Sequence, residues 1–63
     1  MPIKFKVFDW KESKEAAEEK AKWEKKGYTA RYVPTPDDAI VLAYSKLAFT
    51  YRQAKKALAE YYA

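Results

Sequence analysis

Residues 3–8 read Ile-Lys-Phe-Lys-Val-Phe, in which apolar and charged residues alternate up to Val7. An alternation with a period of two predicts a half-buried strand, because successive side chains of a strand point to opposite faces. Residues 28–33 alternate in the same way and are followed by Pro34. The sequence therefore predicts two short strands, over residues 3–8 and 28–33.

Between these stretches the spacing of apolar residues changes to that of a helix. Ser13 is a good N-cap, and Gly27 stands where a chain leaves a helix in the left-handed conformation. These signals predict a helix over residues 14–26, although Asp9 and Glu12 have capping-box spacing and offer an earlier start. The charged residues from Asp9 to Gly27 are six Lys and six Asp or Glu, as on a solvated helix surface.

The segment Thr35-Pro36-Asp37-Asp38 carries the signals of a second helix start: a capping residue, a proline for the first turn and two carboxylates. With no Gly or Pro beyond it, the sequence predicts a long helix over residues 36–62. Apolar residues follow with a 4-3-4-3 spacing that makes one continuous seam: Ile40, Tyr44, Leu47, Tyr51, Ala54, Leu58 and Tyr61. The alternative is a break near Thr50, after which the chain folds back.

The order strand, helix, strand, helix predicts a two-layer α/β sandwich (βαβα) that occupies residues 1–63 as a single domain. A strand–helix–strand crossover makes the two strands parallel, and both helices then cover the same face of the sheet. The other face is expected to stay open. It would carry Lys4, Lys6, Phe8, Thr29, Arg31 and Val33.

A helix over residues 36–62 would be about 40 Å long, whereas strands of six residues span about 20 Å. Half of this helix would overhang, and two parallel strands alone rarely make a stable sheet. We therefore expect a homodimer or higher oligomer that associates through the second helix, with a self-contained monomer as the alternative. The candidate contact residues are Leu42, Phe49, Tyr51, Leu58, Tyr61 and Tyr62.

Composition argues against most catalytic chemistry. The 63 residues include no Cys, no His and a single Gly, so disulfides, zinc fingers, thiol nucleophiles, histidine bases and glycine-rich phosphate loops are excluded. We expect no enzymatic activity, cofactor, metal or small-molecule substrate. The longest uncharged run, residues 39–45, is too short to span a membrane, so we expect a soluble protein of unspecified compartment.

The basic character of the chain suggests a second function class, a small nucleic-acid-binding protein of viral or archaeal type. The formal net charge is +4 and the pI is about 9.3. The open sheet face would combine cations with stacking surfaces, namely Lys4, Lys6, Phe8, Trp10 and Arg31. The charge is spread, with +2 in residues 1–8, 0 in 9–27, −1 in 28–38 and +3 in 39–63. The alternative interpretation is that these lysines only prevent aggregation at the edge of the sheet.

The helix Ser-Lys-Glu-Ala-Ala-Glu-Glu-Lys and the strand entry Lys-Lys-Gly-Tyr-Thr-Ala-Arg-Tyr resemble idealised units of de novo designed α/β mini-proteins. The resemblance covers residues 3–33 and implies a structural scaffold that needs no biochemical activity. The same order also resembles one half of the peptidoglycan-binding SPOR repeat. That family builds a four-stranded sheet from two such halves, whereas this chain has only one, so the function of the family is not carried over. Phe49-Thr50-Tyr51 departs from the designed pattern. The leading hypothesis is a self-associating scaffold protein, and nucleic-acid binding is the alternative.

Overall fold

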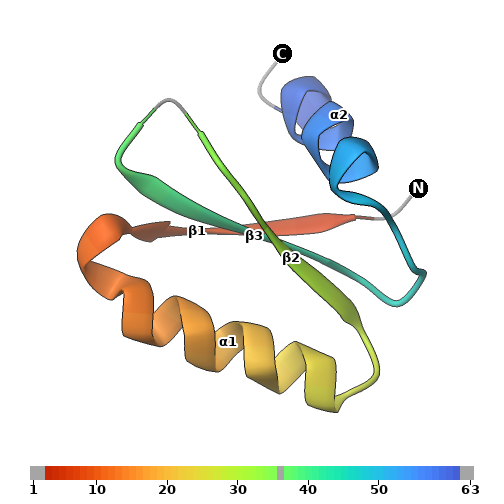
Figure 1. The fold of residues 1–63 in the computed structure, drawn as a ribbon, viewed down its shortest axis with the longest axis horizontal. Coiled ribbons are helices and arrows are strands. Elements are labelled where there is room, and N and C mark those ends of the chain that lie inside the picture. The colour runs from red at the N-terminus through yellow and green to blue at the C-terminus, as the bar shows by residue number, and fades with distance from the viewer. Residues whose placement is uncertain (1–2, 36, 62–63) are drawn as a thin grey trace.

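The computed structural model describes residues 3–35 and 37–61, which form a three-stranded sheet and two α-helices (Figure 1). In chain order the elements are β1 (Lys4–Asp9), a 3-10 turn η1 (Trp10–Glu12), α1 (Ser13–Lys25), β2 (Thr29–Val33), β3 (Ala39–Ser45) and α2 (Tyr51–Tyr61). The first strand, first helix and second strand lie within one residue of their predicted bounds. The remainder of the chain differs from the prediction.

The sheet has the strand order β1-β3-β2, and both neighbouring pairs are antiparallel. Strands β1 and β2 therefore run in the same direction, as a crossover through α1 requires. They do not pair with each other, because β3 lies between them. The predicted sheet of two paired parallel strands was wrong, since the chain supplies its own central strand.

That central strand comes from a segment predicted to be helical. Residues 40–44 are an unbroken apolar run, which is typical of a strand buried on both faces and shows no alternation. Before it, Thr35 shapes the β2–β3 turn, with its Oγ1 3.3 Å from the Asp37 carbonyl oxygen and 3.4 Å from that of Ala39. Thr35, Asp37 and Asp38, which were taken for part of a helix start, therefore lie in a turn, which the same residue types favour, and Pro36 lies outside the described residues.

Helix α2 begins at Tyr51, close to the break near Thr50 that was the alternative prediction. A reciprocal capping box sets this start: the Gln53 amide donates to Thr50 Oγ1 at 3.2 Å, and the Thr50 amide donates to Gln53 Oε1 at 2.8 Å. With 11 residues, α2 is about 16 Å long. The predicted helix over residues 36–62 was wrong, and with it the overhang that motivated a dimer.

The two helices cover opposite faces of the sheet, so the fold has three layers (Figure 1). The α1 side is packed by Phe8, Ala16, Ala30 and Leu42, with Trp23, Ile40 and Tyr44 beside them. The α2 side is packed by Val33, Val41, Ala43, Phe49, Ala54 and Leu58, with Ile3 and Phe5 beside them. The predicted two-layer sandwich with one open face was therefore wrong.

Helix α1 is bounded by two of the predicted signals. Its entry uses the Asp9–Glu12 capping box through η1, with the Asp9 amide donating to Glu12 Oε1 at 2.9 Å. Ser13, the preferred N-cap in the sequence, is instead the first residue of the helix. At the other end Gly27 has a φ of 88° and donates its amide to the Glu24 carbonyl at 3.0 Å, as expected for a left-handed C-terminal glycine.

An ionic contact joins α1 to β1 through Glu19. Its Oε1 lies 3.3 Å from Lys6 Nζ and 3.8 Å from Lys22 Nζ, and it accepts a hydrogen bond from the Trp23 indole at 3.1 Å. Desolvation raises the pKa of Glu19, but the hydrogen bonds and positive charges around the carboxylate outweigh it. The net effect is a pKa below the ordinary value of 4.5.

Replacing Glu19 with Gln is expected to lower the free energy of unfolding slightly at neutral pH. Because the pKa is lower in the folded state, the carboxylate stabilises the fold above about pH 4.5, and this contribution disappears as the pH falls through the folded pKa. The variant and the parent protein should therefore converge in acid, as measured by urea unfolding across pH. Glu15→Gln, on the exposed part of α1, is the control. A difference that persists unchanged in acid would contradict this role for Glu19.

Candidate nucleic-acid interface

The residues predicted to form one nucleic-acid surface do not share a face. They were Lys4, Lys6, Phe8, Trp10 and Arg31. Phe8 is buried in the α1 core, and Lys6 lies on the same face and pairs with Glu19. Arg31 lies on the α2 face, in register with Phe5 and not with Lys6. The predicted platform on an open sheet face was wrong, because α1 covers that part of the sheet.

The predicted self-association residues are also divided. Leu42, Phe49 and Leu58 belong to the two cores and are at most 7% exposed. Tyr51 and Tyr61 are exposed by 43% and 65%, and the Tyr61 ring packs on Phe5 at 5.6 Å. Tyr62 lies outside the described residues. The buried members therefore hold the monomer together.

A different surface follows the outer edge of β2. An open hollow of about 620 Å³, here called the tyrosine groove, passes around this edge from α1 to the start of α2. It is lined by Lys20, Glu24, Tyr28, Thr29, Ala30, Arg31, Tyr32 and Tyr51. No strand of the described chain pairs with this edge, because β2 is terminal in the sheet. The groove thus presents three aromatic rings and two cations beside an unpaired strand.

The tyrosines of the groove come from the α1–β2 connection, from β2 and from α2. Tyr28 follows the α1 C-terminus, where its ring packs on Trp23 at 4.8 Å, and Trp23 in turn stacks on Tyr44 at 4.5 Å and 12°. Tyr32 lies on the α1 face of β2, in register with Leu42, and Lys20 Nζ is 5.7 Å from its ring centre. Tyr51 is placed at the first position of α2. Two of the rings therefore belong to regular elements, and the third is held by its contact with Trp23, which suits a preformed stacking surface.

The groove continues onto a cationic surface of α2. Tyr51, Arg52, Lys55 and Lys56 line an adjoining hollow of about 540 Å³, here called the basic face of α2. Tyr51 belongs to both hollows, and Lys55 Nζ lies 5.7 Å from its ring centre. The opposite side of the helix packs on the sheet through Ala54 and Leu58.

The excess positive charge of the whole chain resides in one segment. Residues 39–59 contain four basic residues and no acidic residue, whereas the remaining nine basic and nine acidic residues balance. Three of the four basic residues form the basic face of α2. The fourth, Lys46, lines a small hollow with Tyr28. The net charge of +4 is therefore a local property of the surface around the tyrosine groove.

Ion pairing strengthens this asymmetry. On α1, Lys20 pairs with Glu24 at 3.1 Å and Lys22 lies 3.8 Å from Glu19, so part of its positive charge is neutralised. Among the described residues, no carboxylate lies within ion-pair distance of the cations at positions 31, 52, 55 and 56. Arg31 uses its Nε to bind the Phe49 carbonyl oxygen at 2.9 Å, which joins β2 to the segment before α2.

The sequence does contain a signal for this site. The absence of Asp and Glu between Asp38 and Glu60 is readable directly, and the spacing of Arg52, Lys55 and Lys56 places them on one helical face. The tyrosine groove could not be predicted from the sequence in the same way. It depends on β2 being a sheet edge, which requires β3 to be recognised as a strand.

Comparisons of the chain with protein-family models, with curated proteins and with solved structures gave no match. Within residues 3–35 and 37–61, no three acidic side chains gather in a way that could hold a metal ion. Neither helix of this part of the chain has the length and apolar character needed to cross a membrane.

Proposed function

We propose that this protein binds single-stranded nucleic acid along the tyrosine groove and the basic face of α2, without catalysing a reaction. The observation that carries the proposal is the concentration of the net charge of +4 around an aromatic groove. Single-strand binders combine cations that follow the phosphates with aromatic rings that stack on the bases. Both components adjoin here through Tyr51.

A single strand fits this surface better than a duplex. The three groove tyrosines line one hollow beside the free edge of β2, and a ring can stack only on a base that has left its own stack. The phosphates would follow the cations at positions 31, 52, 55 and 56. This arrangement gives affinity without base-specific hydrogen bonds, and hence little sequence preference.

Salt dependence is the first test, measured by the fluorescence anisotropy of labelled oligonucleotides of about twelve nucleotides. Four phosphate contacts predict that log K falls with log salt at a slope of about −2.8 for a single strand. Removing two cations with Arg52→Gln and Lys56→Gln should make that slope shallower by about 1.4. A duplex of equal length should bind more weakly than the single strand.

The matched control removes two lysines from exposed positions of α1, with Lys14→Gln and Lys25→Gln. It produces the same net charge as the α2 variant but should retain the parent slope. Equal losses in the two variants would mean that binding is a diffuse charge effect. No binding by the parent protein at low salt would overturn the proposed function.

Stacking is tested in the same assay through Tyr51, which is 43% exposed and adds little to the core. Tyr51→Ala should weaken single-strand binding by about 5- to 150-fold, since each base–aromatic stack contributes about 1–3 kcal/mol. Tyr51→Phe keeps the ring and should bind like the parent protein. If Tyr51→Ala also bound like the parent, Tyr51 would have no stacking role.

A further inference from the structure

A second surface lies on the α2 side of the sheet, where α2 does not reach the whole face. Val7, Val41 and Val33 form one row across the three strands. Val41 and Val33 are 1% and 2% exposed, whereas Val7 is 52% exposed. The β1 end of this row is therefore an uncovered apolar surface.

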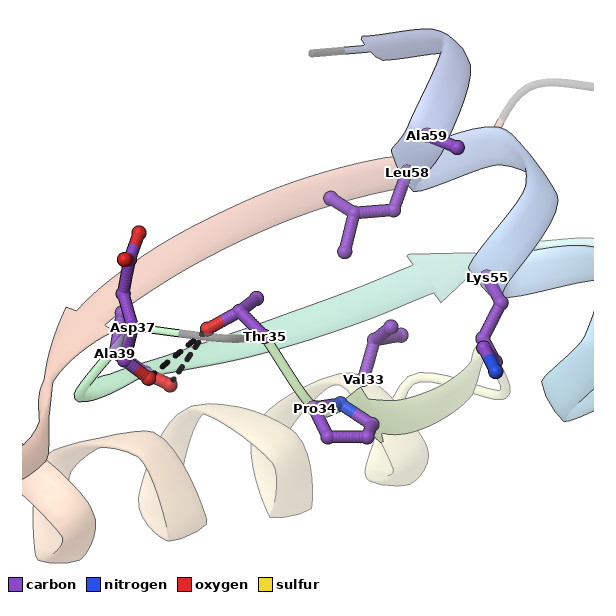
Figure 2. A pocket seen from close by; sticks show the side chains of 8 residues that line it. All are labelled: Val33, Pro34, Thr35, Asp37, Ala39, Lys55, Leu58 and Ala59. Carbon is purple, nitrogen blue, oxygen red and sulfur yellow. Dashed lines mark hydrogen bonds between the residues drawn. The ribbon is translucent and has the colours of Figure 1, made fainter.

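Next to it, α2 and the β2–β3 turn enclose a hollow of about 360 Å³, here called the hairpin cleft. Figure 2 shows its lining: Val33, Pro34, Thr35, Asp37, Ala39, Lys55, Leu58 and Ala59. Most of these side chains are apolar, and Ala39 lies on the same face as Val7, one row further along the sheet. The cleft and Val7 thus form one apolar surface.

The two charged residues of the cleft stand on opposite sides of it. Asp37 belongs to the turn and Lys55 to α2, with Leu58 between them in Figure 2. Neither has an ion-pair partner within 4 Å among the described residues. An apolar surface with an anion on one side and a cation on the other is complementary to itself when rotated by a two-fold axis.

We infer that a second copy of this chain covers the hairpin cleft in a symmetric dimer. Asp37 of each copy would face Lys55 of the partner subunit, so the ionic contact occurs twice. The apolar lining and Val7 would form the centre of the interface. A stable interface of standard size buries about 800 Å² of each partner, roughly a sixth of the 4649 Å² that this chain exposes.

The charges also favour a second copy over a small amphipathic acid. A carboxylate ligand could pair with Lys55, but the Asp37 carboxylate on the other side of the cleft would repel it. A second copy satisfies both residues at once. This inference does not rest on nucleic-acid binding, because the cleft and the tyrosine groove share no lining residue. Lys55 alone belongs both to the cleft and to the basic face of α2.

Sedimentation equilibrium of the nucleic-acid-free protein tests the dimer through charge reversal. Asp37→Lys and Lys55→Asp should each raise the dimer dissociation constant by at least about tenfold, because like charges would then face each other across the interface. Combining the two reversals in one chain should restore the dissociation constant of the parent protein. Circular dichroism is expected to show that all three variants remain folded, since both positions are exposed.

Asp38→Lys is the matched control, because Asp38 is exposed next to Asp37 but does not line the cleft. It changes the charge by the same amount and should leave dimerisation unchanged. A parent protein that stays monomeric at millimolar concentration would overturn the inference, and so would a double reversal that fails to restore the dimer. If the monomer instead bound an apolar dye in the cleft, a small apolar ligand would be the better occupant.

Discussion

Replacing Leu42 with Ala is expected to leave much of the chain unfolded at room temperature. Leu42 is 0% exposed, lies on the central strand β3 and packs with Phe8, Ala16 and Ala30 beneath α1. Truncating a buried leucine costs about 2–5 kcal/mol. A domain of this size rarely has more than about 3–5 kcal/mol of stability. Urea unfolding followed by circular dichroism measures the loss.

Leu47→Ala is the matched control, because Leu47 is 57% exposed in the segment between β3 and α2. Its free energy of unfolding should change by no more than about 0.5 kcal/mol. The sequence alone suggested that Leu42 contacts a partner. If Leu42→Ala kept full stability and changed only the molecular mass in solution, that earlier interpretation would be right and the three-layer core would be wrong.

Phe49→Ala is expected to separate α2 from the sheet. Phe49 is 3% exposed and packs in the core formed by Val41, Ala43 and Leu58, and its carbonyl accepts the Arg31 hydrogen bond. Truncating a buried phenylalanine costs about 3–5 kcal/mol. Hydrogen exchange should show faster exchange of the α2 amides than in the parent protein, with the rest of the chain following as global stability falls.

The aromatic control for this variant is Tyr51→Ala, two residues further along the chain. Tyr51 is exposed at the first position of α2, so its loss should leave the exchange of the α2 amides nearly unchanged. Equal effects of the two substitutions would contradict the burial of Phe49. The comparison also separates the two roles of this segment, since Phe49 holds α2 in place whereas Tyr51 is proposed to contact the ligand.

Local patterns predicted the first half of the fold because their signals are unambiguous. The alternation from Lys4 to Val7 marks β1, and β2 alternates before Pro34. Gly27 ends α1 where its positive φ requires glycine. These features depend on neighbouring residues only, so they can be read without knowing what the strands pair with.

The second half was misread because β3 satisfies two patterns at once. Because every position from 40 to 44 is apolar, positions with helical spacing can always be found in this run. The run is apolar for a different reason, since both faces of a central strand are buried. The Thr50–Gln53 capping box was the readable evidence for a later helix start. Reading β3 as helix then assigned both helices to the same face of the sheet.

This error explains why the nucleic-acid-binding surface was predicted on the wrong face of the sheet. With one face thought to be open, Lys6 and Phe8 were assigned to a binding surface, but α1 covers that side and Glu19 pairs with Lys6. The basic residues of α2 were counted only as part of a net charge spread along the chain. Their grouping beside Tyr51 becomes visible once α2 is a short helix on the opposite face.

The most direct test of the proposed function is the change in backbone amide NMR shifts when a short single-stranded oligonucleotide is added. At about 1 mM oligonucleotide, above the usual range of non-specific dissociation constants of 10⁻⁴–10⁻⁶ M, we expect shifts to concentrate at residues 28–32 and 51–56. The amides of β1 and the exposed side of α1 should change little. Shifts confined to Lys4, Lys6 and Trp10, or none at all, would contradict binding at the tyrosine groove.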